Sequence, residues 1–166
     1  MVLKVAVIGA GAMGQNHLRV YSKMKNVKIV GVADAVFSNA QQAAQAYNCN
    51  AYANADALLA NEKLDAVSIV VPTKLHFQIA SLAITAGVPV LVEKPITFNS
   101  QDARKLITFA KKRKVLLMAG HVERFNPVVT AAKAFLKTGR LGKPVSYLFR
   151  RIGLFPARVK DINVIQ

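Results

Sequence analysis

Short, continuously apolar runs alternate along the chain with longer segments in which apolar residues recur every three or four positions. Strands buried on both faces are indicated by the apolar runs at 3–8, 28–34, 66–71, 88–92 and 115–119, with a further strand at 145–152. Helices are indicated by apolar spacing or by end residues in the segment that contains Leu18, Tyr21 and Met24, and at 39–47, 56–60, 75–86, 100–114 and 127–137. This alternation predicts an α/β protein with a doubly wound parallel sheet over residues 1–125, followed by a separate unit over 126–166.

Several residues are expected to set the ends of these helices. Asp56 is interpreted as the cap of the short helix at 56–60, and Ser100 as the N-cap of the helix at 100–114. Gly87 follows the helix at 75–86, where a glycine commonly ends a helix. The cations of 111–114 complement the negative end of the helix dipole, so we interpret this run as a solvated helix end.

A glycine-rich turn, Gly9-Ala10-Gly11-Ala12-Met13-Gly14, separates the first strand from the first helix. Asp34 follows Gly14 by 20 residues, at the end of the second strand. In this context the pattern is a dinucleotide-binding fingerprint rather than only a tight turn. Gly9 permits the turn, Gly11 lets the backbone approach a pyrophosphate, and Gly14 lets helix and sheet pack closely. The free N–H groups at the start of the helix then hold the phosphates.

The residues around Asp34 favour NAD over NADP. The carboxylate can accept hydrogen bonds from the hydroxyls of an adenosine ribose, and it repels a 2′-phosphate. No Lys or Arg lies between Lys28 and Lys63 to bind such a phosphate. Ser38 and Asn39 can still donate hydrogen bonds to a phosphate, so NADP remains the alternative.

The composition narrows the class of protein. The 166 residues are 53% hydrophobic, enough for a core and too many for a disordered chain. The apolar runs are far shorter than the roughly 20 residues that a bilayer requires, so we expect no membrane partner. The single cysteine, Cys49, excludes an internal disulfide and a cysteine-built metal site. We expect a cytoplasmic protein without a metal.

The formal net charge of +15 is unevenly spread, because 15 of the 23 Lys and Arg residues lie in 101–166. Such a surplus is compatible with nucleic acid, with phosphorylated small molecules or with a missing acidic portion. Nucleic acid is disfavoured, since the sequence contains neither a helix-turn-helix nor a basic ribbon studded with aromatic residues.

Three further motifs follow predicted strands, at the edge where such sheets bind ligands. They are Val71-Pro72-Thr73-Lys74-Leu75-His76, Glu93-Lys94-Pro95 and Gly120-His121-Val122-Glu123-Arg124-Phe125-Asn126-Pro127. Together with the glycine turn and Asp34, they make the chain resemble the Gfo/Idh/MocA oxidoreductases over essentially its whole length. Members of that family combine a Rossmann domain with a C-terminal α/β domain, and they transfer hydride between a nicotinamide cofactor and a sugar-type hydroxyl.

The resemblance implies roles for individual residues. Lys94 matches the catalytic lysine of the family, and Glu93 lies against the nicotinamide end of the cofactor. Pro72 and Thr73 form a loop along the cofactor, with His76 at the start of the next helix. The segment that crosses between the domains below the active site contains Arg124 and Asn126. His17 and His121 are interpreted as structural residues rather than catalysts.

The sequence of residues 120–127 is similar to that found in the branch of the family that acts on UDP-N-acetyl sugars as 3-dehydrogenases. Arg150, Arg151 and Arg158 would suit the diphosphate of such a substrate. Family members are much longer and supply a catalytic histidine from a later helix. We therefore expect a fragment that is inactive alone, in which 126–166 begins an incomplete substrate domain, and a full-length homo-oligomer that assembles through the missing C-terminal sheet. The alternative is a non-catalytic nucleotide-binding or sensory protein.

Overall fold

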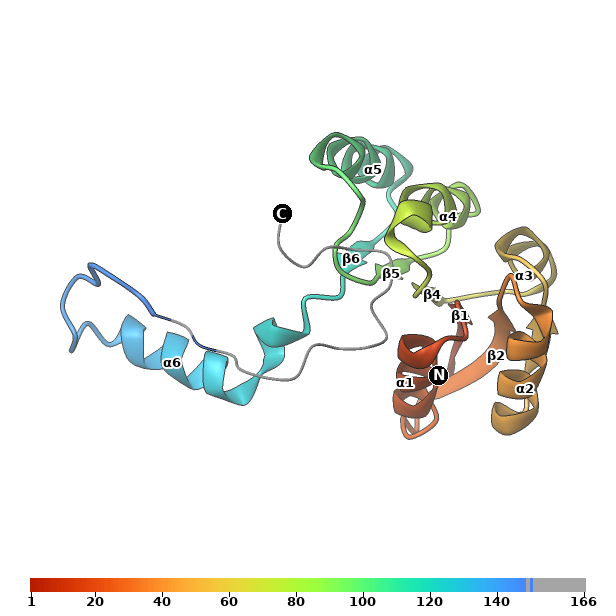
Figure 1. The fold of residues 1–166 in the computed structure, drawn as a ribbon, viewed down its shortest axis with the longest axis horizontal. Coiled ribbons are helices and arrows are strands. Elements are labelled where there is room, and N and C mark those ends of the chain that lie inside the picture. The colour runs from red at the N-terminus through yellow and green to blue at the C-terminus, as the bar shows by residue number, and fades with distance from the viewer. Residues whose placement is uncertain (149, 151–166) are drawn as a thin grey trace. The chain divides into compact units, whose positions relative to one another are not determined.

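A computed structural model describes residues 1–148 and 150. Its centre is a six-stranded, fully parallel sheet in the order β3-β2-β1-β4-β5-β6 (Figure 1). The strands are β1 (Leu3–Ile8), β2 (Val27–Ala33), β3 (Asn50–Tyr52), β4 (Ala66–Ile69), β5 (Val90–Val92) and β6 (Leu117–Ala119). The predicted doubly wound sheet is confirmed. The strand order reverses between β1 and β4, and that switch point is where ligands bind in open α/β sheets.

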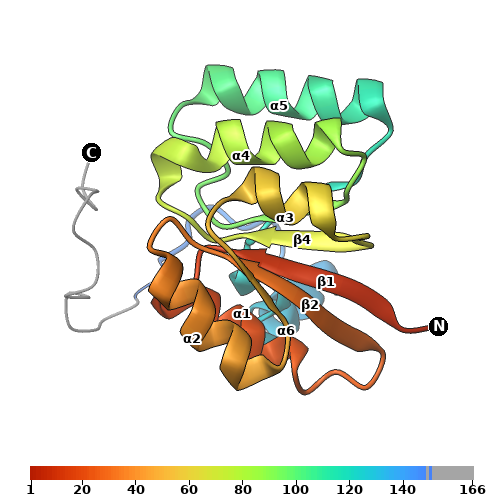
Figure 2. The same ribbon diagram turned by 90° about the vertical axis from the view of Figure 1, so that its right-hand side faces the viewer.

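Helices cover both faces of the sheet. They are α1 (Ala12–Tyr21), α2 (Phe37–Tyr47), α3 (Ala55–Asn61), α4 (Thr73–Thr85) and α5 (Ser100–Arg113). Figure 2 shows α3, α4 and α5 on one side of the strands, and α1 and α2 on the other. Each layer has its own core: Leu58, Ile84 and Leu106 on the first side, and Leu18, Ala40 and Ala43 on the second.

The continuous apolar run of β1 follows from this double cover. Val5 and Val7 pack into the core beneath α1 and α2, whereas Ala6 and Ile8 pack into the core beneath α3, α4 and α5. Since successive side chains of a strand point to opposite faces, a strand covered on both sides needs apolar residues at every position.

The structure corrects two caps and adds one strand. Asn54, not Asp56, caps α3 through its side-chain oxygen, which accepts from the Ala57 N–H at 2.8 Å. Asn99, not Ser100, caps α5 by accepting from the Asp102 N–H at 2.8 Å. The short strand β3 pairs with β2 at the edge of the sheet and has no long apolar run to mark it. Gly87, with φ +75°, follows the end of α4 as predicted.

The strand predicted at 145–152 is not formed in its described part. Residues 145–148 and 150 pair with no strand of the described chain, and Val145 and Leu148 are 98% and 81% exposed. An apolar run becomes a strand only where a neighbour satisfies its N–H and C=O groups, and the described residues offer none here. The rest of the predicted strand lies outside the described residues.

The chain divides after Gly120 into two compact units, 1–120 and 121–166. In its described part the second unit contains a 3-10 turn, η1 (Val122–Phe125), and the predicted helix α6 (Pro127–Lys137). Neither element buries a residue. That this unit begins a substrate domain stays a prediction. Throughout the described residues, no helix is long and apolar enough to span a membrane.

Candidate functional site

The three glycines of the turn after β1 are required for different physical reasons. Gly9 has φ +102°, and a Cβ there would collide with the Val70 carbonyl oxygen. A Cβ on Gly14 would collide with the Gly9 carbonyl oxygen, so helix and turn touch at this point. A Cβ on Gly11 would meet no atom within 4 Å. The fold itself therefore requires Gly9 and Gly14, whereas the space at Gly11 is open to a ligand.

The start of α1 is suited to an anion. Gly11 is the N-cap residue, and it supplies no side-chain cap to the first N–H groups of the helix. No acidic side chain lies in the first turn. The unpaired N–H groups and the positive end of the helix dipole therefore face the open space at Gly11. This arrangement fits the pyrophosphate predicted there.

Asp34 ties the end of β2 to the glycine turn. Its Oδ2 accepts a hydrogen bond from the Ala10 N–H at 2.7 Å, and its Oδ1 accepts one from the Val36 N–H at 2.8 Å. Each carboxylate oxygen can accept a second hydrogen bond, so both remain available to ribose hydroxyls. The side chain is partly exposed beside the turn, as the fingerprint requires.

A cavity of about 270 Å³ opens next to Asp34, near the lower end of the range for small-molecule sites. Four predicted cofactor residues line it: Gly9, Gly11, Asp34 and Pro72. Its other lining residues were not predicted from the sequence, and they include Ala53, Asn54, Ala55, Leu75 and Ile79. Ser38 is exposed in the first turn of α2 and is not part of this lining. The mostly apolar walls with one carboxylate suit a nucleoside.

A second polar group lies at the carboxyl end of β5. The Glu93 side chain is 11% exposed, and its Oε1 lies 3.0 Å from His17 Nε2. Its Oε2 accepts a hydrogen bond from the Lys94 N–H at 3.1 Å. The hydrogen bond from His17 is the main reason why the pKa of Glu93 lies below its ordinary value, although burial acts in the opposite direction.

The hydrogen bonds continue from His17 into the interior. His17 Nδ1 lies 3.2 Å from Ser68 Oγ, and Ser68 Oγ lies 2.6 Å from the Tyr21 hydroxyl. Because an ionised carboxylate can only accept, His17 Nε2 donates to Glu93. A neutral ring then accepts from Ser68 at Nδ1, and Ser68 accepts from Tyr21. The sequence indicated a structural role for His17, but it gave no sign of these partners.

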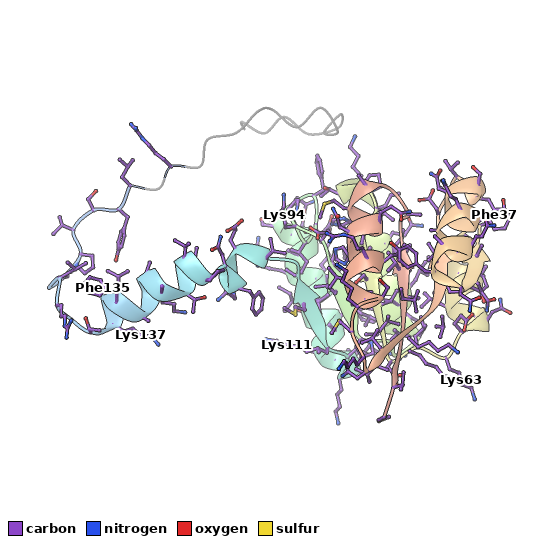
Figure 3. All side chains as sticks on the ribbon, turned by 90° about the horizontal axis from the view of Figure 1, so that it is seen from below. Phe37, Lys63, Lys94, Lys111, Phe135 and Lys137 are labelled. Atoms are coloured by element: carbon purple, nitrogen blue, oxygen red, sulfur yellow. The ribbon has the colours of Figure 1, made fainter. Side chains whose placement is uncertain are left out.

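Lys94 follows Glu93 directly and is exposed. In Figure 3 it lies at one end of the first unit, whereas Lys63 and Lys111, near the amino ends of the strands, lie at the other end. A cis peptide bond joins Lys94 to Pro95. The Lys94 side chain is thus placed at the ligand-binding edge of the sheet, next to Glu93.

His76 joins two loops of this edge. Its side chain is buried, with Nδ1 2.8 Å from the Pro95 carbonyl oxygen and Nε2 2.9 Å from the Val71 carbonyl oxygen. Thr73, in the first turn of α4, is also buried. The His76 ring therefore contacts the backbone of the loops after β4 and β5, and it is not part of the lining of the cavity beside Asp34.

The predicted substrate residues belong to the second unit. Arg124 lines an open cavity of about 420 Å³ together with His121, Glu123, Val129, Thr130 and Lys133. Asn126 caps α6, since its Oδ1 accepts from the Val128 N–H at 3.0 Å, and its Nδ2 donates to Glu123. Arg151 and Arg158 lie outside the described residues. No group of His, Cys, Asp and Glu that could hold a metal occurs in the part of the chain that the structure describes.

The sheet, the glycine turn and Asp34 define a dinucleotide-binding protein of the Rossmann class. The sequence profile of the Gfo/Idh/MocA family, an oxidoreductase family with an NAD-binding Rossmann fold, matches residues 3–121. The chain belongs to this family.

The chain is similar to several curated enzymes and solved structures. The UDP-N-acetylglucosamine 3-dehydrogenase of Acidithiobacillus ferrooxidans is 36% identical over 163 residues, which cover 98% of this chain and 50% of the relative. Its solved structure superposes with a TM-score of 0.75 over 87% of this chain and 45% of that one. The inositol 2-dehydrogenase of Rhizobium meliloti is 30% identical over 93% of this chain and 51% of the relative. This chain therefore spans about half the length of the curated relatives it matches.

A third relative was solved with its cofactor. GenD2 from gentamicin A biosynthesis, in complex with NAD, is 33% identical and superposes with a TM-score of 0.69. The match covers 72% of this chain and 34% of that chain.

Proposed function

We propose that this chain is the cofactor-binding part of an NAD-dependent oxidoreductase that acts on a secondary hydroxyl of a sugar, nucleotide sugar or cyclitol. The observation that carries the proposal is the position of Asp34, hydrogen-bonded to the glycine turn beside a cavity and the open space at Gly11. Bound NAD supplies the hydride acceptor, and the chain's own residues bind and orient it.

The residues divide along the edge of the sheet according to the two halves of the cofactor. Asp34 and the cavity beside it suit the adenosine, and the first N–H groups of α1 suit the pyrophosphate. Ala10, Ala12 and Met13 complete this turn. A dinucleotide crosses the switch point, so its nicotinamide half falls on the β4–β5 side, where Glu93 and Lys94 lie.

Lys94 is proposed as the catalytic residue, holding the proton of the reacting hydroxyl at Nζ. Oxidation of an alcohol removes a hydride and a proton, and a side chain within hydrogen-bond reach of the hydroxyl accelerates the proton transfer. Lys94 is exposed at the proposed nicotinamide end, next to a carboxylate. Pro72, Thr73 and His76 are proposed to shape the loop along the cofactor, with His76 acting through its contacts to both loops.

NAD is proposed over NADP because of Asp34. A 2′-phosphate would place a negative charge beside the carboxylate, and no Lys or Arg occurs between Lys28 and Lys63 to compensate it. Ser38 and Asn39, both exposed in the first turn of α2, are the predicted donors for such a phosphate.

The substrate proposal follows the relatives. The 36% identical relative is named for a UDP-N-acetyl sugar, and the 30% identical one for inositol. The first is favoured, since the basic residues Arg124 and Arg150 of the second unit would suit a diphosphate. Asn126 and Arg158 are proposed to assist, and assembly into a homo-oligomer is proposed for the whole protein.

The alternative is a non-catalytic nucleotide-binding or sensory protein. Both hypotheses require NAD binding, so turnover distinguishes them.

Titration calorimetry of the chain with NAD⁺ tests the shared step. Gly11→Val should abolish detectable binding, because its side chain would fill the space proposed for the pyrophosphate. The variant should fold, since Gly11 has an ordinary negative φ of −67° and open surroundings. Ala86→Val, at the exposed end of α4, is the matched control and should bind normally. Unchanged binding by Gly11→Val would contradict the proposed site.

A further inference from the structure

A chain of polar side chains crosses an otherwise apolar face of the sheet. Ser68, in the middle of β4, is fully buried, and it is joined to His17 and Tyr21 of α1. Leu18 and Val7 of the same layer are fully buried apolar residues. A buried polar group costs free energy unless it is hydrogen-bonded, and each side chain of this series has a hydrogen-bond partner. This series of hydrogen bonds ends at the Glu93 carboxylate, which His17 contacts.

Among the described residues, no Lys or Arg side chain forms a salt bridge with the Glu93 carboxylate. Its two hydrogen-bond donors are the His17 ring and the Lys94 backbone N–H. In the neutral His17 tautomer that satisfies Ser68 and Tyr21, both donors are uncharged. The pKa of Glu93 is lowered, chiefly by the hydrogen bond from His17, while burial acts in the opposite direction; the Lys94 backbone N–H and the charges of His17 and Lys94 lower it further. The carboxylate is therefore ionised at neutral pH and has a fixed orientation.

The position of this charge matters for the cofactor, and this step rests on the proposed function. Asp34 follows β2 and Glu93 follows β5, with β1 and β4 between these two strands. Three strand spacings, about 14 Å in all, separate the two strands that these carboxylates follow. A dinucleotide with its adenosine ribose at Asp34 crosses the glycine turn and extends toward Glu93 with its nicotinamide half.

We propose that Glu93, oriented by His17, raises the affinity of this site for the oxidised cofactor relative to the reduced cofactor. The oxidised nicotinamide ring carries a positive charge, whereas the reduced ring is neutral. A carboxylate in a partly buried position attracts the first electrostatically and gains little from the second. Glu93 is thus a residue that discriminates redox states, and His17 is its positioning residue.

The test compares the Kd values of NAD⁺ and NADH for the wild-type chain and for Glu93→Gln. The substitution keeps the shape of the side chain and removes its charge. The Kd of NAD⁺ should rise about tenfold, equivalent to about 1.4 kcal/mol, while the Kd of NADH changes by less than about twofold. Asp102→Asn, in the first turn of α5, removes one negative charge elsewhere and should leave both values unchanged. Equal changes for both cofactors, or no change for either, would overturn the proposal.

Variants of His17 provide a second measurement that does not depend on Glu93→Gln folding. His17→Gln can still donate to Glu93 and accept from Ser68, so it should keep the wild-type ratio of the two Kd values. His17→Leu should lower the preference for NAD⁺ by about threefold and raise the pKa of Glu93, measured by NMR titration of its side-chain carboxyl carbon. A merely structural role for His17 would weaken both cofactors alike.

The outcomes separate this inference from the proposed function. If the wild-type chain binds neither NAD⁺ nor NADH, the proposed function is wrong and the inference falls with it. If the chain binds both, and the ratio of Kd values is the same in the wild-type chain, Glu93→Gln and His17→Leu, the proposed function stands and only the inference is wrong.

Discussion

The Oδ2 atom of Asp34 accepts a hydrogen bond from the backbone N–H of Ala10 at 2.7 Å. The residue directly after β2 therefore also fixes the turn after β1. The carboxylate therefore has two tasks. It stabilises the loop on which the cofactor is proposed to lie, and it presents its remaining lone pairs to the ribose. Substitutions of Asp34 are expected to change both stability and cofactor choice.

Replacing Asp34 by Ser and Ala35 by Arg should shift cofactor preference from NAD⁺ toward NADP⁺. The change removes the charge that repels a 2′-phosphate and adds a guanidinium that binds it. Charged hydrogen bonds contribute about 1.5–3 kcal/mol, so the ratio of the two Kd values should change by about 10- to 100-fold. Titration calorimetry measures it. Tighter binding of NADP⁺ than NAD⁺ by the wild-type chain would show that the role given to Asp34 is wrong.

Two alanine substitutions in the glycine turn should differ in their effect on stability. Gly14→Ala forces a methyl group against the Gly9 carbonyl oxygen and should lower the free energy of unfolding by about 1–3 kcal/mol or more. Gly11→Ala points into open space and should change it by less than about 0.5 kcal/mol. Urea denaturation of both variants measures the difference. A similar loss for the two would mean that packing alone explains the motif.

Asn54→Ala should destabilise the chain by about 1 kcal/mol, since it removes the cap of α3. Asp56→Ala should cost less, because Asp56 contributes only a charge near the positive end of the helix dipole. Thermal denaturation of the two variants ranks them. A larger loss for Asp56→Ala would restore the cap indicated by the sequence alone.

These caps illustrate what local sequence can and cannot specify. The parallel sheet was predictable because strands buried on both faces leave unbroken apolar runs such as 3–8. The caps were displaced by one or two residues because Asn54 and Asp56, like Asn99 and Ser100, are all good capping residues. Only the backbone geometry decides which oxygen reaches the third N–H. The short strand β3 depends on its pairing with β2 rather than on an apolar run of its own.

The candidate site was predictable to a similar degree. The glycines and Asp34 are close in sequence, with spacings set by one βαβ unit, so the motif revealed them. The link of His17 to Glu93 joins residues 76 positions apart. That contact depends on the position of α1 on the sheet, which brings His17 beside Ser68 of β4 and the residue after β5, and no local pattern encodes it. The predicted strand at 145–152 failed for the opposite reason, since its residues are apolar but its described part has no paired neighbour.

The stability of the chain should fall as the pH is lowered through the titration of Glu93. The folded-state pKa lies below the ordinary value of 4.5, chiefly because His17 donates to the carboxylate. The unfolded chain therefore binds the proton more readily, and the contribution to stability is present above about pH 4.5 and is lost below it. Urea denaturation between about pH 3 and 6 should show a steeper pH dependence for the wild-type chain than for Glu93→Gln. Identical slopes would exclude this linkage.

The 166-residue chain should bind NAD⁺ yet fail to oxidise UDP-N-acetyl sugars or inositols at an appreciable rate. General acid–base groups accelerate proton transfer by about 10²- to 10⁴-fold, and only when the substrate is held against them. Lys94 is exposed here, and the relatives named for such reactions are about twice as long as the matched region. We expect the unmatched half to complete the substrate pocket.

In a protein that carries that additional length, Lys94→Ala should abolish turnover, measured as NADH formation, while the Kd of NAD⁺ changes by only a few fold. Asp34 and the glycine turn hold the other end of the cofactor, so binding does not depend on Lys94. Lys111→Ala removes the same charge from the last turn of α5, at the opposite end of the sheet, and serves as the control (Figure 3). Activity of Lys94→Ala would show that Lys94 is not the catalytic residue. Rapid turnover of these substrates by the 166-residue chain alone would show that the substrate pocket needs no further residues.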